Sequence, residues 1–167
     1  MKKIYSFVAA LVVAMVVLAS CGASSAYQAQ LDAAKAALEA KDANTAFAKV
    51  EEIIAGDKVT VDDALIATMY AMNAYGIELQ KGNGQLDPAT NLELCKKVAA
   101  AYNKAKTFPE AELNKSNEAM KIVSGNDVMA TAAQYVQNIP NLESAIQAAA
   151  EAGQGDPEEE DAEGEAE

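Results

Sequence analysis

The longest stretch of helix-forming sequence, residues 61–81, constrains the fold more than any other part of the chain. Apolar residues recur there every three or four positions along two separate stripes, which is the pattern of a helix with two apolar sides. Such a helix needs neighbours on both sides, so we expect it to lie at the centre of the domain. Thr60 and Asp63 form a predicted capping box at its start. The stripes are Val61, Leu65, Met69, Met72 and Leu79, and Ile66, Tyr70 and Ile77.

The rest of the body divides into further helical segments at glycine, proline and capping residues. No segment alternates with a period of two, so the sequence predicts an all-α fold of antiparallel helical hairpins without a sheet. Alanine is abundant, and it has the best helix propensity. The predicted helical domain covers residues 26–152, and Pro140 is expected to end one helix and open the last. Besides 61–81, the predicted helices are 25–41, 43–55, 87–106, 108–124, 127–139 and 140–152.

The first twenty residues have the composition of a secretory signal peptide. Lys2 and Lys3 precede an apolar run over residues 4–19, and small residues follow it. This run is shorter than the roughly 20 apolar residues that a membrane-spanning helix needs. We therefore expect export and removal of residues 1–20.

The segment Leu-Ala-Ser-Cys-Gly, residues 18–22, resembles the lipobox of bacterial lipoproteins. The resemblance implies that Cys21 is lipidated and becomes the first residue of the mature chain, with residues 21–25 as anchor and linker. The residue after this cysteine is Gly22, and in this position the chain resembles lipoproteins that are sorted to the outer membrane. The resemblance implies that the protein lies on the periplasmic face of that membrane. The alternative location is the outer face of a cell with a single membrane. The alternative to a lipoprotein is a secreted protein in which this cysteine has no special role.

The first predicted hairpin, residues 27–58, resembles one tetratricopeptide unit. Small and apolar residues stand where paired helices of that family cross, with a short turn between the two helices. The segments after Val59 do not keep a repeat length near 34, so the body is predicted to be either a tetratricopeptide-like stack or an irregular helical bundle. The residues that carry the resemblance are Ala34, Leu38, Asp42, Ala46, Val50 and Ile53.

Composition argues against several kinds of chemistry. The chain has no His and no Arg, which removes the commonest general base, the commonest transition-metal ligand and the bidentate phosphate clamp. We therefore expect no enzyme activity, no cofactor and no metal site. The 25 acidic residues outnumber the 13 basic ones, all of which are Lys, so nucleic acid is not an expected partner. Residues 153–167 carry eight of the acidic residues and are predicted to be a disordered tail.

Two groups of side chains remain as candidates for binding. Cys95 lies in an apolar-rich stretch, where a buried cysteine acts as a small hydrophobe, although a reactive thiol is the alternative. The tyrosines could line a groove for a ligand or a partner, or pack in the core with their hydroxyls at its edge. The sequence thus predicts a membrane-anchored lipoprotein that acts as a protein-interaction scaffold; the alternative is a lipoprotein that binds a small apolar or aromatic ligand between helices. The candidate groove residues are Tyr70, Tyr75, Tyr102 and Tyr135.

Overall fold

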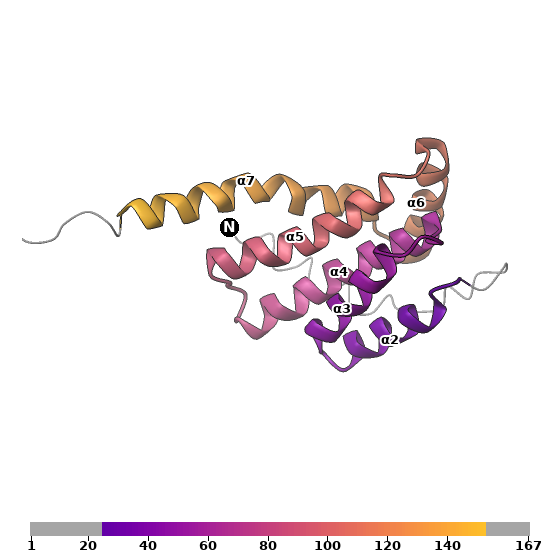
Figure 1. Cartoon of the computed structure of the whole chain (residues 1–167), viewed down its shortest axis with the longest axis horizontal. Helices are drawn as coiled ribbons and strands as arrows, with labels where there is room; N and C mark the ends of the chain where they lie inside the picture. Colours follow the sequence, from indigo (N-terminus) through magenta and orange to yellow (C-terminus); the bar gives the residue numbers. More distant parts are fainter. Residues whose placement is uncertain (1–24, 153–167) are drawn as a thin grey trace, which may run out of the picture.

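The computed structural model describes residues 25–152, and this part of the chain is all-α, as predicted. It contains six helices and no strand (Figure 1). The predicted signal peptide, Cys21 and the acidic tail lie outside the described residues. None of the helices in the described part is long and apolar enough to cross a membrane. The helices are α2 (Gln28–Glu39), α3 (Ala43–Ile54), α4 (Val61–Lys81), α5 (Pro88–Ala105), α6 (Glu110–Ser124) and α7 (Val128–Ala152).

The long helix α4 lies at the centre, as its two apolar stripes predict. Each of the other five described helices packs against it. Consecutive helices from α2 to α5 pack on one another, and α5 packs along α7 over the most extensive interface of the domain. Helices two places apart along the stack also touch, namely α2 with α4, α3 with α5, and α4 with α7. The helices therefore form a stack of hairpins in which α4 contacts both α2 and α7, and these two lie on opposite sides of the domain (Figure 1).

Local sequence signals set the helix ends. The Thr60 hydroxyl accepts the Asp63 N–H at 3.2 Å, and the Asp63 carboxylate accepts the Thr60 N–H at 3.0 Å, which completes the predicted capping box of α4. Asp87 caps α5, and Pro88 occupies its first turn. Gly125 ends α6 in the left-handed conformation with φ of 73°. These three signals were readable in the sequence because each satisfies backbone groups locally.

Gly56, directly after the C-terminal cap of α3, leaves room for a side chain from the start of α2. Helix α3 ends one residue earlier, with Ala55 as the cap in an ordinary right-handed conformation. A Cβ at position 56 would lie 1.9 Å from the hydroxyl oxygen of Tyr27. The glycine thus leaves room for the Tyr27 ring, which packs the start of α2 against the loop between α3 and α4.

The prediction that Pro140 separates two helices is wrong. Helix α7 runs through Pro140 from Val128 to Ala152. Proline removes one backbone hydrogen bond, but its fixed φ is compatible with a helix. Side chains on both sides of it hold α7 in place: Tyr135 packs against Tyr75 of α4, and Glu143 pairs with Lys96 of α5 at 2.9 Å. Tertiary packing therefore overrides the local stop signal.

Candidate functional site

Two of the four candidate tyrosines meet at a junction of three helices. The rings of Tyr75 on α4 and Tyr135 on α7 are 4.8 Å apart at an interplanar angle of 77°, an edge-to-face arrangement. The Tyr75 hydroxyl donates to Oδ1 of Asn91 on α5 at 2.9 Å. The junction thus ties α4, α5 and α7 together through one aromatic contact and one hydrogen bond.

The side chains of this junction are neutral and serve in packing. Burial raises the pKa of Tyr75 and of Tyr135 to about 12, so both hydroxyls stay neutral at physiological pH. Cys95 is buried beside them, with Sγ 3.4 Å from Oδ1 of Asn91, and burial raises the pKa of its thiol. A protonated, buried thiol is a poor nucleophile, which agrees with the predicted role of Cys95 as a small hydrophobe.

The other two candidate tyrosines lie elsewhere. Tyr70 precedes Tyr75 by five residues, which turns it by about 140° around α4. It is buried, and this burial, followed by the negative charges of Asp32 and Glu39 on α2, raises its pKa. Tyr102 follows Asn91 by about three helical turns on α5 and has the Lys106 ammonium 5.8 Å from its ring centre. The structure therefore brings together Tyr75 and Tyr135, and it places Tyr70 on a different side of α4.

One line of residues along α4 is exposed at its two ends, partly exposed in its first half and buried at Asn73. Five residues lie within about 60° of one another around the helix axis, given 100° per residue. Two of them are exposed, and Ile66 and Met69 are partly exposed although they are apolar. We call this set the α4 strip; its members are Asp62, Ile66, Met69, Asn73 and Gln80.

Asn73, in the middle of the α4 strip, is the least expected feature of the described part of the chain. Its side chain is buried, with 7% of its surface exposed, and neither Nδ2 nor Oδ1 has a hydrogen-bond partner. Nearly all buried polar groups in proteins have a partner, and an amide without one lowers stability. Sequence reasoning missed this residue, although a signal was present: Asn73 interrupts the apolar stripe between Tyr70 and Ile77.

Charged residues lie beside Tyr70 and at the ends of α4. Tyr70, about 60° from Asn73 around α4, faces the charged side of α2 that carries Asp32 and Glu39. Lys35 lies between these two carboxylates along α2, and Asp62 adds a further carboxylate at the start of the strip. Asp32 and Glu39 thus lie near Tyr70, whereas Asp62 and Lys81 lie at the two ends of α4.

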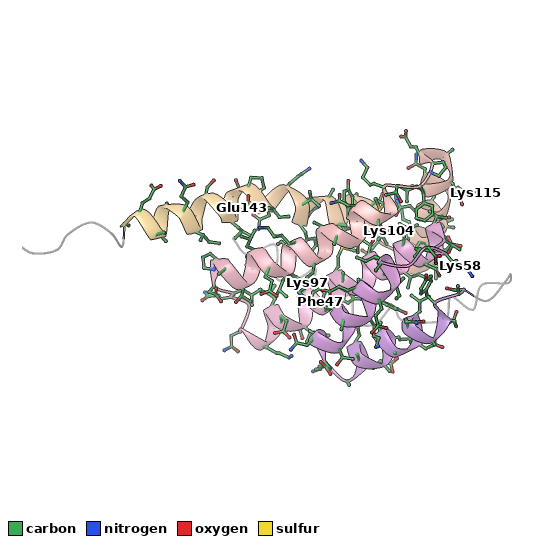
Figure 2. All side chains as sticks on the ribbon, viewed as in Figure 1. Phe47, Lys58, Lys97, Lys104, Lys115 and Glu143 are labelled. Carbon is green, nitrogen blue, oxygen red and sulfur yellow. The ribbon has the colours of Figure 1, made fainter. Side chains whose placement is uncertain are left out.

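The lysines of α5 are engaged within the body. Lys97 pairs with Glu51 of α3 at 2.9 Å and lies 5.6 Å from the ring centre of Phe47. Lys104 donates to the carbonyl oxygen of Gly56 at 3.2 Å. Figure 2 labels Lys97 near Phe47, and Lys104 farther along α5. This basic face is therefore used to hold hairpins together.

A small apolar patch lies apart from the α4 strip, at the end of α6. Ile122 is 84% exposed and Val123 is 54% exposed, whereas Leu113 and Met120 of the same helix are buried. Ile122 and Val123 therefore lie on the exposed side of α6. Two adjacent residues make a small patch, and scattered exposed apolar residues are common on proteins.

Comparisons with known proteins identify no related family, protein or structure. No family model, no curated protein and no solved structure matches the chain. The resemblance of residues 27–58 to a tetratricopeptide unit thus rests on the hairpin residues alone. Within residues 25–152, no three side chains of the metal-binding kinds come together.

Proposed function

We propose that the protein is a lipid-anchored scaffold of the cell envelope that binds a partner protein through the α4 strip. The observation that carries the proposal is the pair of apolar residues Ile66 and Met69, which stay partly exposed on the central helix. Binding surfaces have an apolar centre and a polar rim, because a partner removes the apolar area from water. The stack of hairpins supports this proposal, since it holds the strip on a rigid central helix.

The tyrosine junction does not favour the alternative of a small-ligand carrier. The rings of Tyr75 and Tyr135 contact each other, and the Tyr75 hydroxyl already has Asn91 as its partner. A ligand between them would have to break both interactions. The α4 strip keeps two apolar side chains, Ile66 and Met69, partly exposed, so it is the better candidate.

The proposed anchor is Cys21, from the lipobox resemblance. Attachment through two or three acyl chains would be effectively permanent, because each buried CH₂ contributes about 0.8 kcal/mol. Replacing Cys21 by Ser should abolish incorporation of labelled fatty acid and release the body from membranes. A Cys21→Ser protein that still carries labelled lipid, or a wild-type protein that keeps residues 1–20, would contradict the anchor.

The partner is tested by placing a photo-crosslinking amino acid at single positions in cells. We expect a discrete protein adduct from position Met69 on the α4 strip. Asn103, exposed on α5, is the matched control and should give none. Position Ile122 tests the patch on α6 separately. The absence of a protein adduct from all three positions would contradict the scaffold role.

A further inference from the structure

We propose that the end of the body that carries α6 contacts the membrane that holds the anchor, with Ile122 and Val123 inserted among the lipid headgroups. This inference rests on the proposed anchor at Cys21 and adds a further partner, the surface of a lipid bilayer. It depends on three properties of the chain: the short link between Cys21 and α2, the elements that share the end where α2 begins, and the exposed apolar residues of α6.

The link between the anchor and the body is short. Four residue steps separate Cys21 from Ser25, the first described residue, and an extended chain spans at most about 3.6 Å per residue. Ser25 therefore lies within about 14 Å of the lipidated cysteine. Helix α6 alone, with 15 residues, is about 22 Å long at 1.5 Å per residue. Because the link is shorter than one helix of the body, the end where α2 begins stays next to the bilayer.

Helix α6 lies at the same end of the body as the start of α2. The Tyr27 hydroxyl, at the start of α2, accepts the Lys58 N–H of the loop between α3 and α4 at 3.5 Å. In the same loop, the Gly56 carbonyl oxygen accepts the Lys104 ammonium at 3.2 Å, which places the end of α5 there too. Only residues 106–109 separate the end of α5 from the start of α6. Figure 1 shows α6 and the start of α2 at one end of the long axis, and Figure 2 places Lys58 and Lys115 there.

The most exposed apolar side chains of the described helices lie on α6. Ile122 is 84% exposed and Val123 is 54% exposed, whereas the other large apolar side chains in residues 25–152 are buried or partly exposed. Insertion among headgroups would remove both from water. The pair is small for a protein interface, but contact with a bilayer needs less area, because the anchor already holds the body there.

The charges of α6 favour no particular class of lipid. The helix carries three carboxylates and two ammonium groups, and Glu118 lies 3.5 Å from Lys121. Charges that nearly balance neither attract nor repel anionic headgroups strongly. We therefore expect an apolar contact that forms equally on neutral and anionic bilayers. The charged residues of α6 are Glu110, Glu112, Lys115, Glu118 and Lys121.

The acidic part of the chain follows from the opposite end of the body. Helix α7 ends at Ala152, at the other end of the long axis from α6 (Figure 1). Residues 156–167, which come next, carry eight carboxylates and no Lys. Anionic headgroups repel such a segment. The body is thus oriented with α6 toward the bilayer and the end of α7 away from it.

The test uses the processed full-length protein in lipid vesicles, and it is simple because the chain contains no Trp. Ile122→Trp introduces a single fluorophore, and bromine atoms on the acyl chains quench a Trp that enters the bilayer. We expect brominated vesicles to reduce its emission by a factor of about two relative to unbrominated ones, since a side chain inserted at the interface reaches the acyl boundary. The matched control Gln85→Trp lies in the exposed loop between α4 and α5, at the opposite end, and its emission should be unchanged.

A second measurement separates insertion of the pair from a general approach of the body to the bilayer. Val123→Asp, combined with Ile122→Trp, places a carboxylate beside the fluorophore and should remove most of the quenching. The matched change Gln85→Asp, combined with Ile122→Trp, should leave the quenching unchanged. All three positions are exposed, so these changes do not disturb the core. Neutral and anionic vesicles should give the same result.

The outcomes that overturn the inference differ from those that overturn the anchor. A wild-type protein that does not float with vesicles in a density gradient would contradict the anchor at Cys21, and the inference with it. Flotation without quenching of Ile122→Trp, equal quenching of Gln85→Trp, or quenching in anionic vesicles alone would each refute the inference and leave the anchor intact. A protein adduct from position Ile122 in cells would refute it in favour of a protein partner for α6.

Discussion

Replacing Asn73 by Leu should make the unbound protein more stable, which is the opposite of what most changes to a buried position do. A buried amide without a partner costs about 1–3 kcal/mol relative to a satisfied or apolar group. Leu has the same branched arrangement of heavy atoms as Asn and requires no hydrogen bond. Because neither Nδ2 nor Oδ1 of Asn73 is bonded within the body, no interaction is lost. We therefore expect the free energy of unfolding to rise by about 1–3 kcal/mol.

Thr68→Val is a control on the same helix for which the free energy of unfolding should change in the opposite direction. Thr68 is fully buried, and its hydroxyl donates to the carbonyl oxygen of Ala64 at 2.7 Å. Valine keeps the shape of the side chain and removes this hydrogen bond. A satisfied hydrogen bond contributes about 0.5–1.5 kcal/mol, so Thr68→Val should lower the free energy of unfolding by that amount. The two variants differ in whether the removed polar group had a partner.

Thermal and urea unfolding of the processed full-length protein, followed by circular dichroism, measure both changes. At roughly 4 °C per kcal/mol for a domain of this size, Asn73→Leu should raise the midpoint by about 4–12 °C. The slope of the urea transition should be unchanged, because the surface exposed on unfolding is nearly the same. A lower midpoint for Asn73→Leu would mean that the amide has a partner in solution.

Three further predictions concern the core, the tyrosine junction and the tail. Leu65 is fully buried on α4, so Leu65→Ala should cost about 2–5 kcal/mol in urea unfolding; a change near zero would contradict the central position of α4. The folded-state pKa values of Tyr75 and Tyr135, about 12, lie above the usual value, so their contribution to stability is present below about pH 10 and is lost as pH rises toward 12. In an ultraviolet titration of tyrosinate, Tyr75→Phe should remove one group that ionises late, and an unchanged late phase would contradict its burial. Deleting residues 156–167 should leave helix content and midpoint nearly unchanged, because exposed charge pairs contribute at most about 1 kcal/mol; a large loss of stability would show that the tail packs on the body.

The parts of the fold that the sequence predicts well are those set by local chemistry. The bounds of α4 agree with the prediction at both ends, since Thr60 and Asp63 cap its start and Gly82 follows its end. Asp87 and Pro88 set the start of α5 in the same way. At each helix start an Asp or Thr side chain accepts backbone N–H groups within the same turn, and the φ of Pro88 is fixed in the helical range, so these starts are set by local residues.

The parts that the sequence predicts poorly depend on contacts between distant residues. Helical spacing places Tyr70 and Tyr75 on one helix, but only the position of α7 decides that Tyr75 meets Tyr135. Asn73 illustrates the same limit, because its spacing marks it as part of an apolar stripe and says nothing about a hydrogen-bond partner. The sequence reveals a polar residue within an apolar stripe, and only the folded arrangement shows whether its partner is missing.

The continuity of α7 determines where residues 141–152 lie. Had Pro140 ended a helix, as the sequence predicted, these residues would have been free to fold back over the neighbouring helices. Instead α7 continues along α5, where Glu143 pairs with Lys96, and its last turns project beyond the other helices (Figure 1). The course of the last helix therefore depends on contacts with α4 and α5 rather than on the local proline signal.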